Sequence, residues 1–297
     1  MSKTIIIIGA GLAGLSAALQ AAENGCNVKL VSSLPSERAQ SVMAEGGINA
    51  ALNTKDENDS PEEHFTDTIK AACGLADPNA VWGMTQAAPE LVHWLLKLGV
   101  KFNISGYDDV DLRNFGGQKK KRTAFAQSDT GKQIMTAMID AVRRKEASGM
   151  VERFSHHSFL TLRLCGNICC GCVIRDEYSQ ETVELPGDAV IVATGGMHGL
   201  FGNTTGSLNN TGEVTAELFR LGVPLANGEM IQYHPTTVKC GGKRMLISEA
   251  ARGEGGRLFA MKDGKQWYFM EEKYPELGNL MPRDITAREI WKVSHES

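Results

Sequence analysis

The segment Ile5–Gly14 reads IIIIGAGLAG, an apolar run that leads directly into a glycine-rich turn. Four consecutive isoleucines suit a parallel strand that is buried on both faces. The glycines then follow with the spacing GxGxxG, and the residues up to Gly25 have the pattern of a helix. In such a turn the first glycine permits a tight bend, the second lets the backbone approach a pyrophosphate, and the third lets the helix pack on the strand. The segment predicts a dinucleotide-binding turn with the candidate residues Gly9, Gly11, Ala13 and Gly14.

A second strand is predicted at Val28–Val31, and Ser32 and Ser33 stand at its end. In dinucleotide-binding folds this position usually holds an acidic residue that hydrogen-bonds the adenosine ribose. A serine hydroxyl can make a hydrogen bond of the same kind, so both serines are candidate cofactor-binding residues. The residues themselves leave the choice between NAD and FAD open.

A third buried strand is predicted at Ala189–Ala193, and it runs into Thr194-Gly195-Gly196. Further along, Asn210–Glu213 begins another helix whose first turn can face an anion. Two such strand ends, about 180 residues apart, indicate one large doubly wound domain with the intervening helices inserted into it. The candidate cofactor-binding residues of this part are Ala193, Thr194, Gly195 and Glu213.

Composition excludes several classes of protein. With 297 residues the chain can bury a large core and hold more than one domain. A net charge of -4 argues against a nucleic-acid surface, which needs clustered positive charge. Residues 5–22 carry no charge, but the glycines and Gln20 disfavour both a signal peptide and a membrane span. Seven cysteines without a framework spacing fit a reducing compartment, so we expect a cytoplasmic protein that contacts membranes only through a partner.

Four of the cysteines lie in the run from Cys165 to Cys172. One interpretation is a zinc or iron–sulfur site. The other is a β-hairpin around Gly166-Asn167 in which cysteine serves as a small apolar residue. Because neighbouring strand residues point to opposite faces, Cys169 and Cys170 are poorly placed to share a metal. The hairpin is therefore favoured and no metal site is predicted.

Three further segments carry predictions about local structure. Residues 153–164, RFSHHSFLTLRL, are predicted to form one strand, and residues 132–149 a helix with one apolar face. KKKR at 119–122 is predicted to be a solvated loop. As a nuclear or nucleic-acid signal, such a basic tract has a high false-positive rate in an acidic chain. Gly46 and Gly47 lie in a segment of small residues, which lets backbone approach a flat cofactor closely.

Seven short motifs follow one another along nearly the whole chain. They are GAGLAG at 9–14, MAEGGINAAL at 43–52, GGQKKKRT at 116–123, ATGG at 193–196, QYHPT at 232–236, SEAARGEGG at 248–256 and PRD at 282–284. In this order they make the chain resemble the N-terminal half of the flavoprotein subunit of the fumarate reductase and succinate dehydrogenase family, which also includes L-aspartate oxidase.

The resemblance implies an α/β fold, in which a Rossmann-like FAD-binding domain (1–235) precedes the start of an α+β capping domain (236–297) that closes over a dicarboxylate. It implies FAD rather than NAD, and an oxidoreductase of electron transport that interconverts fumarate and succinate. The expected partner is an iron–sulfur subunit, with membrane contact at the inner face made only through partner subunits. Because the rest of the family's capping domain is missing from the sequence, we expect a fragment that alone can be inactive.

Adding a hydride to a dianion requires cations and hydrogen-bond donors that hold the carboxylates. The resemblance assigns substrate binding to His234 and catalysis to Arg283. Ser248 falls at the position of a threonine that contacts a substrate carboxylate, and Glu249 matches a glutamate near the proton route. Since a guanidinium stays charged at ordinary pH, Arg283 can donate a proton only if a relay replaces it at once.

In respiratory members of the family, a histidine in a motif resembling RSHT is bonded covalently to the flavin. The corresponding residues here are 38–41, and Gln40 occupies the position of the histidine. The resemblance therefore implies non-covalent FAD, which favours fumarate reduction over succinate oxidation. Further candidate cofactor-binding residues are Gln40, Ser41, Ala44, Gly46 and Gly47.

Three alternative functions are considered. An L-aspartate oxidase-like enzyme agrees with Gln40, whereas GGQKKKRT resembles the respiratory branch. A flavin-binding module without turnover follows if half of the substrate-binding residues are absent. An NAD-dependent dehydrogenase is disfavoured because ATGG, HPT and RGEGG occur together.

Overall fold

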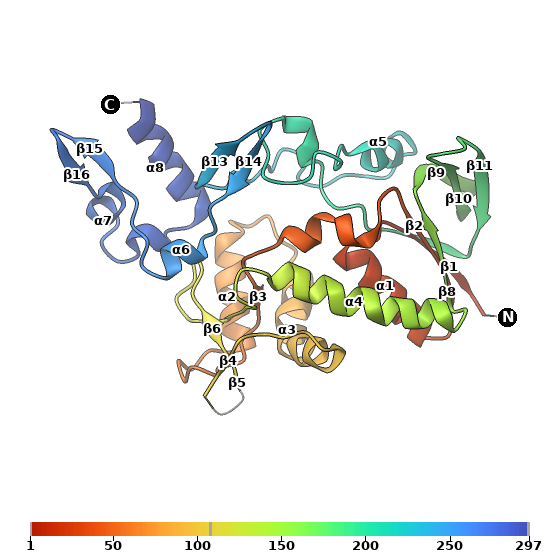
Figure 1. Cartoon of the computed structure of the whole chain (residues 1–297), viewed down its shortest axis with the longest axis horizontal. Helices are drawn as coiled ribbons and strands as arrows, with labels where there is room; N and C mark the ends of the chain where they lie inside the picture. The colour runs from red at the N-terminus through yellow and green to blue at the C-terminus, as the bar shows by residue number, and fades with distance from the viewer. Residues whose placement is uncertain (1, 107–108, 296–297) are drawn as a thin grey trace. The chain divides into compact units, whose positions relative to one another are not determined.

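The computed structural model describes residues 2–106 and 109–295 (Figure 1). The contacts between residues divide the chain into two compact units. Unit 1 contains Met1–Ala44, Leu98–Val100 and Gly131–Gly228, and unit 2 contains Glu45–Lys97, Lys101–Thr130 and Glu229–Ser297. The domain boundary between residues 235 and 236 stays a prediction.

Unit 1 is built on a parallel sheet with the strand order β12-β1-β2-β8. The strands are β1 (Thr4–Ile8), β2 (Asn27–Ser32), β8 (Val151–Ser155) and β12 (Ala189–Val192). Helix α1 (Leu12–Glu23) follows β1 directly and contacts β1, β2 and β12. The predicted strands and first helix are confirmed, as is the α/β fold class. The predicted burial of the third strand is wrong, because β12 lies at the edge of the sheet and Ile191 and Val192 are 40% and 38% exposed. Because all four strands run parallel, their carboxyl ends meet at one edge of the sheet, where such folds bind ligands.

A three-stranded antiparallel sheet packs against the parallel sheet. Its strands are β9 (His157–Cys165), β10 (Ile168–Asp176) and β11 (Thr182–Pro186), in the order β11-β10-β9. Cys172 and Ile174 of β10 are fully buried in one cluster with Ile6, Ile8 and Val31 of the parallel sheet. Cysteine is therefore a small apolar core residue at this position, as the hairpin interpretation predicted.

The predicted hairpin turn at Gly166-Asn167 is confirmed, because β9 and β10 pair directly across it. The register shifts between Cys169 and Gly171, and the structure joins Cys165 to Cys170 in a disulfide that the sequence did not predict. Among residues 2–106 and 109–295, no group of three or more His, Cys, Asp or Glu side chains is arranged to hold a metal ion.

The prediction of one strand over residues 153–164 is wrong. The strand breaks at His156, whose φ of 59° lies in the left-handed region. Residues before the break pair with β2 in the parallel sheet, and residues after it pair with β10 in the antiparallel sheet. A chain that passes from one sheet to another must turn, and the hydrophobic pattern does not register such a turn.

The remaining helices of unit 1 include α4 (Thr130–Ala147), which begins at the last residue of unit 2, and α5 (Glu213–Arg220). Short 3-10 turns lie at η1 (Ser36–Arg38), η2 (Gln40–Met43) and η3 (His198–Phe201). Helix α4 confirms the predicted apolar face, since Ile134, Met138, Ile139 and Val142 are all buried.

The longer helices of unit 2 are α2 (Pro61–Ala71), α3 (Pro78–Leu98) and α8 (Arg283–His295), and its other elements are short. A small sheet in the order β3-β7-β6 joins β3 (Ile48–Asn49), β7 (Thr123–Ala124) and β6 (Leu112–Arg113). The other strands are paired in hairpins: β4 (Ile104–Ser105) with β5 (Asp109–Val110), β13 (Thr237–Cys240) with β14 (Lys243–Leu246), and β15 (Ala260–Lys262) with β16 (Lys265–Trp267). The unit ends with α6 (Ala250–Gly253), α7 (Phe269–Lys273), η4 (Gly278–Leu280) and α8 (Arg283–His295).

The prediction of a solvated loop for KKKR is wrong at its last residue. Arg122 is only 1% exposed, because its guanidinium donates to both oxygens of Asp59 and forms a further ion pair with Asp67. The preceding lysines contact the same stretch of chain, since Lys121 donates its backbone N–H to Glu57. The basic tract is thus part of a charged packing interface within unit 2.

None of the helices in the described part of the chain combines the length and the apolar character needed to cross a bilayer.

Candidate functional site

A pocket of about 320 Å³ lies in unit 1 at the carboxyl ends of the parallel strands. Its walls come from the ends of β1, β2 and β12, the first turn of α1, the segment from Arg38 to Ser41, and the residues that lead into α5. The predicted cofactor-binding residues that line it are Gly9, Gly11, Ala13, Ser32, Ser33, Gln40, Ser41, Ala193, Thr194, Gly195 and Glu213.

The three glycines of the first turn occupy distinct environments. Gly9 has a φ of 109°, and a Cβ there would lie 2.3 Å from the carbonyl oxygen of Ala193. A Cβ on Gly14 would lie 1.8 Å from the carbonyl oxygen of Gly9, so this residue packs helix on strand and does not line the pocket. Gly11 lines the pocket. Among the described residues, the nearest atom to a Cβ added at Gly11 would be the Ser41 hydroxyl oxygen, at 3.4 Å. The arrangement leaves the backbone at Gly11 open to a ligand beside the first turn of α1.

The end of β2 carries an unused hydrogen-bonding group. Ser32 is 8% exposed, and its Oγ is buried without a hydrogen-bond partner among the described residues. Buried polar atoms are nearly always paired in native proteins, so this hydroxyl in the pocket wall fits a ligand that supplies a hydrogen bond. The hydroxyls of an adenosine ribose have that chemistry, so the residues present fit FAD.

Gln40 reaches across the pocket wall to a distant loop. Its Oε1 accepts a hydrogen bond of 2.6 Å from the backbone N–H of Ser207, and both residues line the pocket. Ser41 is also engaged, since its Oγ accepts from the backbone N–H of Leu12 in the first turn of α1.

Besides Gly14, three predicted cofactor-binding residues do not line this pocket. The carbonyl oxygen of Ala44 accepts from the N–H of Gly131 in unit 1. Gly46 and Gly47 belong to unit 2, where a Cβ on Gly46 would lie 3.0 Å from the Phe115 ring. Gly47 has a φ of 134° and lies against β7. The contact of these residues with the flavin stays a prediction.

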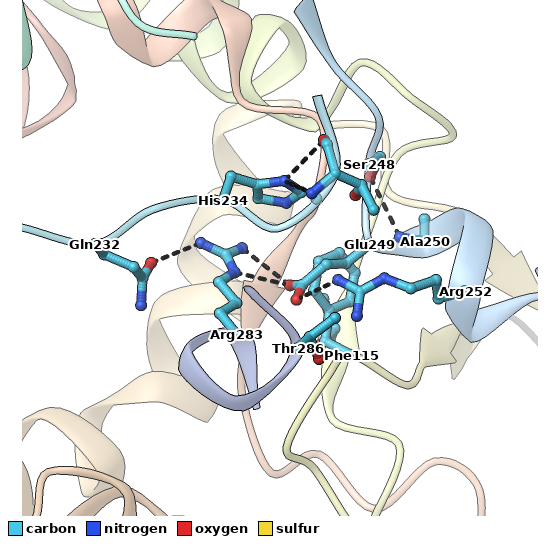
Figure 2. Close-up of polar contacts among 12 residues, drawn as sticks. Phe115, Gln232, His234, Ser248, Glu249, Ala250, Arg252, Arg283 and Thr286 are labelled. Carbon is cyan, nitrogen blue, oxygen red and sulfur yellow. Dashed lines mark hydrogen bonds and ion pairs between the residues drawn. The ribbon is translucent and has the colours of Figure 1, made fainter. Parts of the chain in front are cut away.

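The candidate substrate-binding residues gather in unit 2 around Glu249 (Figure 2). Arg283, the first residue of α8, donates from Nε (3.0 Å) and Nη2 (2.9 Å) to Oε2 of Glu249. Its Nη1 donates to Oε1 of Gln232 at 2.8 Å. A guanidinium carries five N–H donors, so two of them, one on Nη1 and one on Nη2, have no acceptor among the described residues.

A second arginine completes the contacts of Glu249. Arg252 donates from Nη2 to Oε1 of Glu249 at 2.9 Å, and from Nη1 to the carbonyl oxygen of Asn279 at 2.9 Å. Glu249 is 3% and Arg252 6% exposed, while the Arg283 side chain is 36% exposed. Burial lowers the pKa of Arg252, and the nearby charge of Arg283 lowers it further, while Glu249 opposes both. The three side chains form an unbroken chain of charge-assisted hydrogen bonds from a buried to a partly exposed guanidinium.

His234 lies in a loop before β13, beside the three hydrogen-bonded side chains of Arg252, Glu249 and Arg283 (Figure 2). Its Nδ1 is 3.0 Å from the carbonyl oxygen and 3.3 Å from the amide nitrogen of Thr236, so neither contact uses Nε2. Burial lowers the pKa of His234, and the charge of Arg283 lowers it further. The imidazole is therefore neutral near pH 7.

Ser248 stands immediately before Glu249, and its Oγ accepts from the backbone N–H of Ala250 at 3.3 Å. A hydroxyl that accepts one hydrogen bond still has its own proton to donate. The structure thus brings together all four residues predicted for the substrate site: His234, Ser248, Glu249 and Arg283.

Three residues of this cluster were not predicted from the sequence: Gln232, Arg252 and Asn279. Arg252 could have been found, because it follows Glu249 at a spacing of three residues, which places two side chains on one helix face. Gln232 lies within the QYHPT motif and Asn279 outside every motif, and no local pattern pairs either one with an arginine.

The family of the chain follows from its similarity to known proteins. A family model described as an FAD binding domain matches residues 4–297. The succinate dehydrogenase flavoprotein subunit of Bacillus subtilis is 46% identical over 292 residues, which cover 98% of this chain and 50% of that protein. An L-aspartate oxidase of Streptomyces coelicolor is 34% identical and is matched over 100% of this chain and 51% of its own length.

Among solved structures, a mutant of E. coli quinol fumarate reductase aligns with a TM-score of 0.90 at 27% identity, over 100% of this chain and 51% of that chain. The chain spans about half the length of the curated relatives that it matches. Because the family model covers nearly every residue, the chain belongs to the FAD binding domain family.

Proposed function

We propose that this chain is the FAD-binding and substrate-binding part of a flavoprotein subunit that interconverts fumarate and succinate. The observation that carries the proposal is the chain of hydrogen bonds Arg283–Glu249–Arg252, which ends in two free N–H donors on Arg283. A cation with a bidentate fork suits a carboxylate better than a point charge does. The similarity to a succinate dehydrogenase flavoprotein subunit supports the same substrate class.

The reaction adds a hydride to one alkene carbon and a proton to the other. Bound FAD supplies the hydride. Arg283 has two tasks, since one of its free N–H donors binds a substrate carboxylate and draws charge into it, while the other gives a proton to the second carbon. His234 holds the other carboxylate when Nε2 carries the proton, in the tautomer whose Nδ1 accepts from the Thr236 amide at 3.3 Å; the Thr236 carbonyl oxygen, nearer at 3.0 Å, instead favours a proton on Nδ1.

Arg283 can act as an acid only if its proton is replaced at once. Glu249 is placed for this role, because Oε2 contacts Arg283 and Oε1 contacts Arg252. A proton passed from Arg252 to the carboxyl group can go on to Arg283 without leaving the chain of hydrogen bonds. The lowered pKa of Arg252, caused by burial, makes this guanidinium a better donor than an exposed one.

FAD is held without a covalent bond in this proposal. Gln40 lacks the imidazole that forms the link, and its amide oxygen instead contacts the backbone of Ser207. The FAD-binding domain extends to residue 235, and the residues after it begin a capping domain. An iron–sulfur subunit passes the electrons, and the protein is cytoplasmic, at the inner face of the membrane where partner subunits anchor it.

An L-aspartate oxidase-like activity is the second candidate, supported by the relative from Streptomyces coelicolor. An amino acid substrate needs a carboxylate that can meet its ammonium group. Both oxygens of Glu249 already accept from guanidinium groups, so this carboxylate is committed to Arg252 and Arg283. That geometry favours fumarate over aspartate.

The test is anaerobic and uses the FAD-loaded protein. The flavin is reduced with dithionite, fumarate is added, and reoxidation is followed in the visible spectrum. Reoxidation by fumarate supports the proposal, whereas reduction of oxidised flavin by L-aspartate supports the second candidate. A flavin that responds to neither substrate indicates a binding module without turnover, and a colourless protein that binds nicotinamide refutes the FAD assignment.

Arg283→Lys should abolish the response to fumarate while FAD stays bound, because an ammonium group cannot replace the guanidinium fork. Arg288→Lys, one helical turn along α8 at an exposed position, is the matched control and should behave as the wild type. Normal activity of Arg283→Lys would remove Arg283 from the mechanism. Acid precipitation should leave all the flavin in the supernatant, and a yellow pellet would contradict non-covalent binding.

A further inference from the structure

Gly116 lies in the loop between β6 and β7, and its backbone conformation does not require glycine. Its φ lies outside the left-handed region, in contrast to the neighbouring Gly117 at 82°. A φ outside that region does not by itself favour glycine. Another constraint must therefore explain why the position is suited to glycine.

The constraint is space beside the carboxylate of Glu249. A Cβ on Gly116 would lie 3.0 Å from Oε1 of Glu249 and 3.3 Å from the carbonyl oxygen of Met281. Both distances are shorter than an ordinary carbon–oxygen contact, so an added methyl group would be pinched between the two oxygens.

Both oxygens are engaged in hydrogen bonds, so displacing either one disturbs a contact. Glu249 is held by three guanidinium contacts from two arginines. The Met281 carbonyl accepts from the hydroxyl of Thr286 at 3.0 Å. The loop that carries Gly116 is itself anchored, because the N–H of Gly117 donates to the Leu280 carbonyl at 2.7 Å.

We propose that Gly116 is a positioning residue for the proton relay, because the absence of a side chain there lets Oε1 of Glu249 stay within hydrogen-bond distance of Arg252. The inference rests on the proposed function and adds a residue to it that touches neither arginine nor substrate. An added methyl group displaces Oε1 by a few tenths of an ångström and so disturbs its contact with Arg252, on the side from which the proton is replaced. The two free N–H donors of Arg283 remain available to the substrate.

The first experiment compares Gly116→Ala with the wild type in the FAD-loaded holoenzyme. The variant should lower kcat for fumarate about tenfold, because small displacements of a proton-transfer group are costly, while KM changes less than about twofold. The solvent deuterium isotope effect on kcat should rise, since proton replacement becomes slower than hydride transfer. Gly242→Ala is the matched control, because a Cβ there meets nothing within 4 Å.

The second experiment needs no turnover and examines the contact itself. Thermal midpoints are measured for Gly116→Ala, Glu249→Asp and the double variant. Gly116→Ala alone should lower the midpoint by about 2–4 °C, the shift expected for about 1 kcal/mol in a protein of this size. In the Glu249→Asp background the same substitution should lower the midpoint less, because the shorter side chain withdraws the carboxylate from Gly116 and leaves only the contact with the Met281 carbonyl.

The outcomes separate the inference from the proposed function. A wild-type holoenzyme that does not reduce fumarate refutes the proposed function. The thermal midpoints of the single and double variants then test only the contact between Gly116 and Glu249. Equal shifts of the midpoint in both backgrounds overturn the inference. So does a Gly116→Ala protein that loses FAD, or one whose kcat and isotope effect match the wild type.

Discussion

Replacing Arg122 with methionine should strongly destabilise unit 2, because it leaves a buried carboxylate without its partner. Arg122 donates from Nε (3.1 Å) and Nη2 (2.8 Å) to the two oxygens of Asp59, and the two side chains are only 2% and 1% exposed. Removing one member of a buried ion pair costs about 3–5 kcal/mol. Asp67, the other partner, is 32% exposed and keeps access to water, so it adds little to this loss.

The effect can be measured as a shift of Tm in the FAD-loaded protein. About 1 kcal/mol corresponds to about 2–4 °C for a protein of this size, so Arg122→Met should lower Tm by about 6–20 °C. Lys121→Met is the control from the same basic tract. Its ion pair with Glu57 spans 3.9 Å at the surface and contributes less than about 1 kcal/mol.

The pH dependence supplies a second test of the same reasoning. Burial raises the pKa of Asp59 above 3.8, and Arg122 opposes this rise. Without Arg122 the pKa of Asp59 rises further, so the folded variant holds a proton that the unfolded chain has released. The difference in Tm between the wild type and Arg122→Met should therefore shrink as pH falls from about 8 toward about 5. Equal Tm values for Arg122→Met and Lys121→Met, or a deficit independent of pH, would refute the argument.

Three further predictions concern the two sites. Gly9→Ala should abolish FAD binding measured by absorbance, because its Cβ would lie 2.3 Å from the carbonyl oxygen of Ala193. Ser32→Ala should weaken FAD about three- to tenfold in a fluorescence titration, the loss of one ordinary hydrogen bond. The pKa of His234 is lowered from 6.5 by burial and by Arg283, so the unfolded chain takes up a proton first as pH falls. The free energy of unfolding in urea should therefore decrease below about pH 6.5, and His234→Gln should remove that part of the slope.

The controls for these predictions come from the same chain. Gly83→Ala places a Cβ where nothing lies within 4 Å and should bind FAD normally. Ser148→Ala removes a surface hydroxyl outside the pocket and should leave FAD affinity unchanged. FAD retention by Gly9→Ala would show that the turn tolerates a side chain. An unchanged affinity for Ser32→Ala, or an unchanged pH slope for His234→Gln, would contradict the roles given to these residues.

The first turn of unit 1 could be predicted because its determinants are local. A strand, three glycines and a helix lie within the first 25 residues, and Gly9 and Gly14 each answer a constraint set by near neighbours or by one adjacent strand. The hairpin at Gly166-Asn167 and the apolar face of α4 were accessible for the same reason, since alternation and helical periodicity act over a few residues. The four substrate-site residues were found through motif order, which reports membership in a family and not geometry.

Tertiary structure alone decided where the chain changes direction and which charges are buried. The break at His156 occurs because the residues on its two sides pair in different sheets. The burial of Arg122 depends on Asp59, which is 63 residues away in the sequence. From the sequence alone a basic tract is predicted to be solvated, because the positions of its counter-ions are not known.

The relay shows the same division between sequence and structure. Motifs indicated that Glu249 and Arg283 matter, but the fold brings them into contact across 34 residues and adds Gln232 across 51. The need for glycine at position 116 is likewise a property of the packed structure, because the oxygens that would meet its side chain come from two other segments. The sequence by itself determined the local turn that suits a dinucleotide and the residue types suited to a dicarboxylate. Only the tertiary structure decided which donors face which acceptors, because hydrogen bonds and contacts act over a few ångströms in space, whatever the separation along the chain.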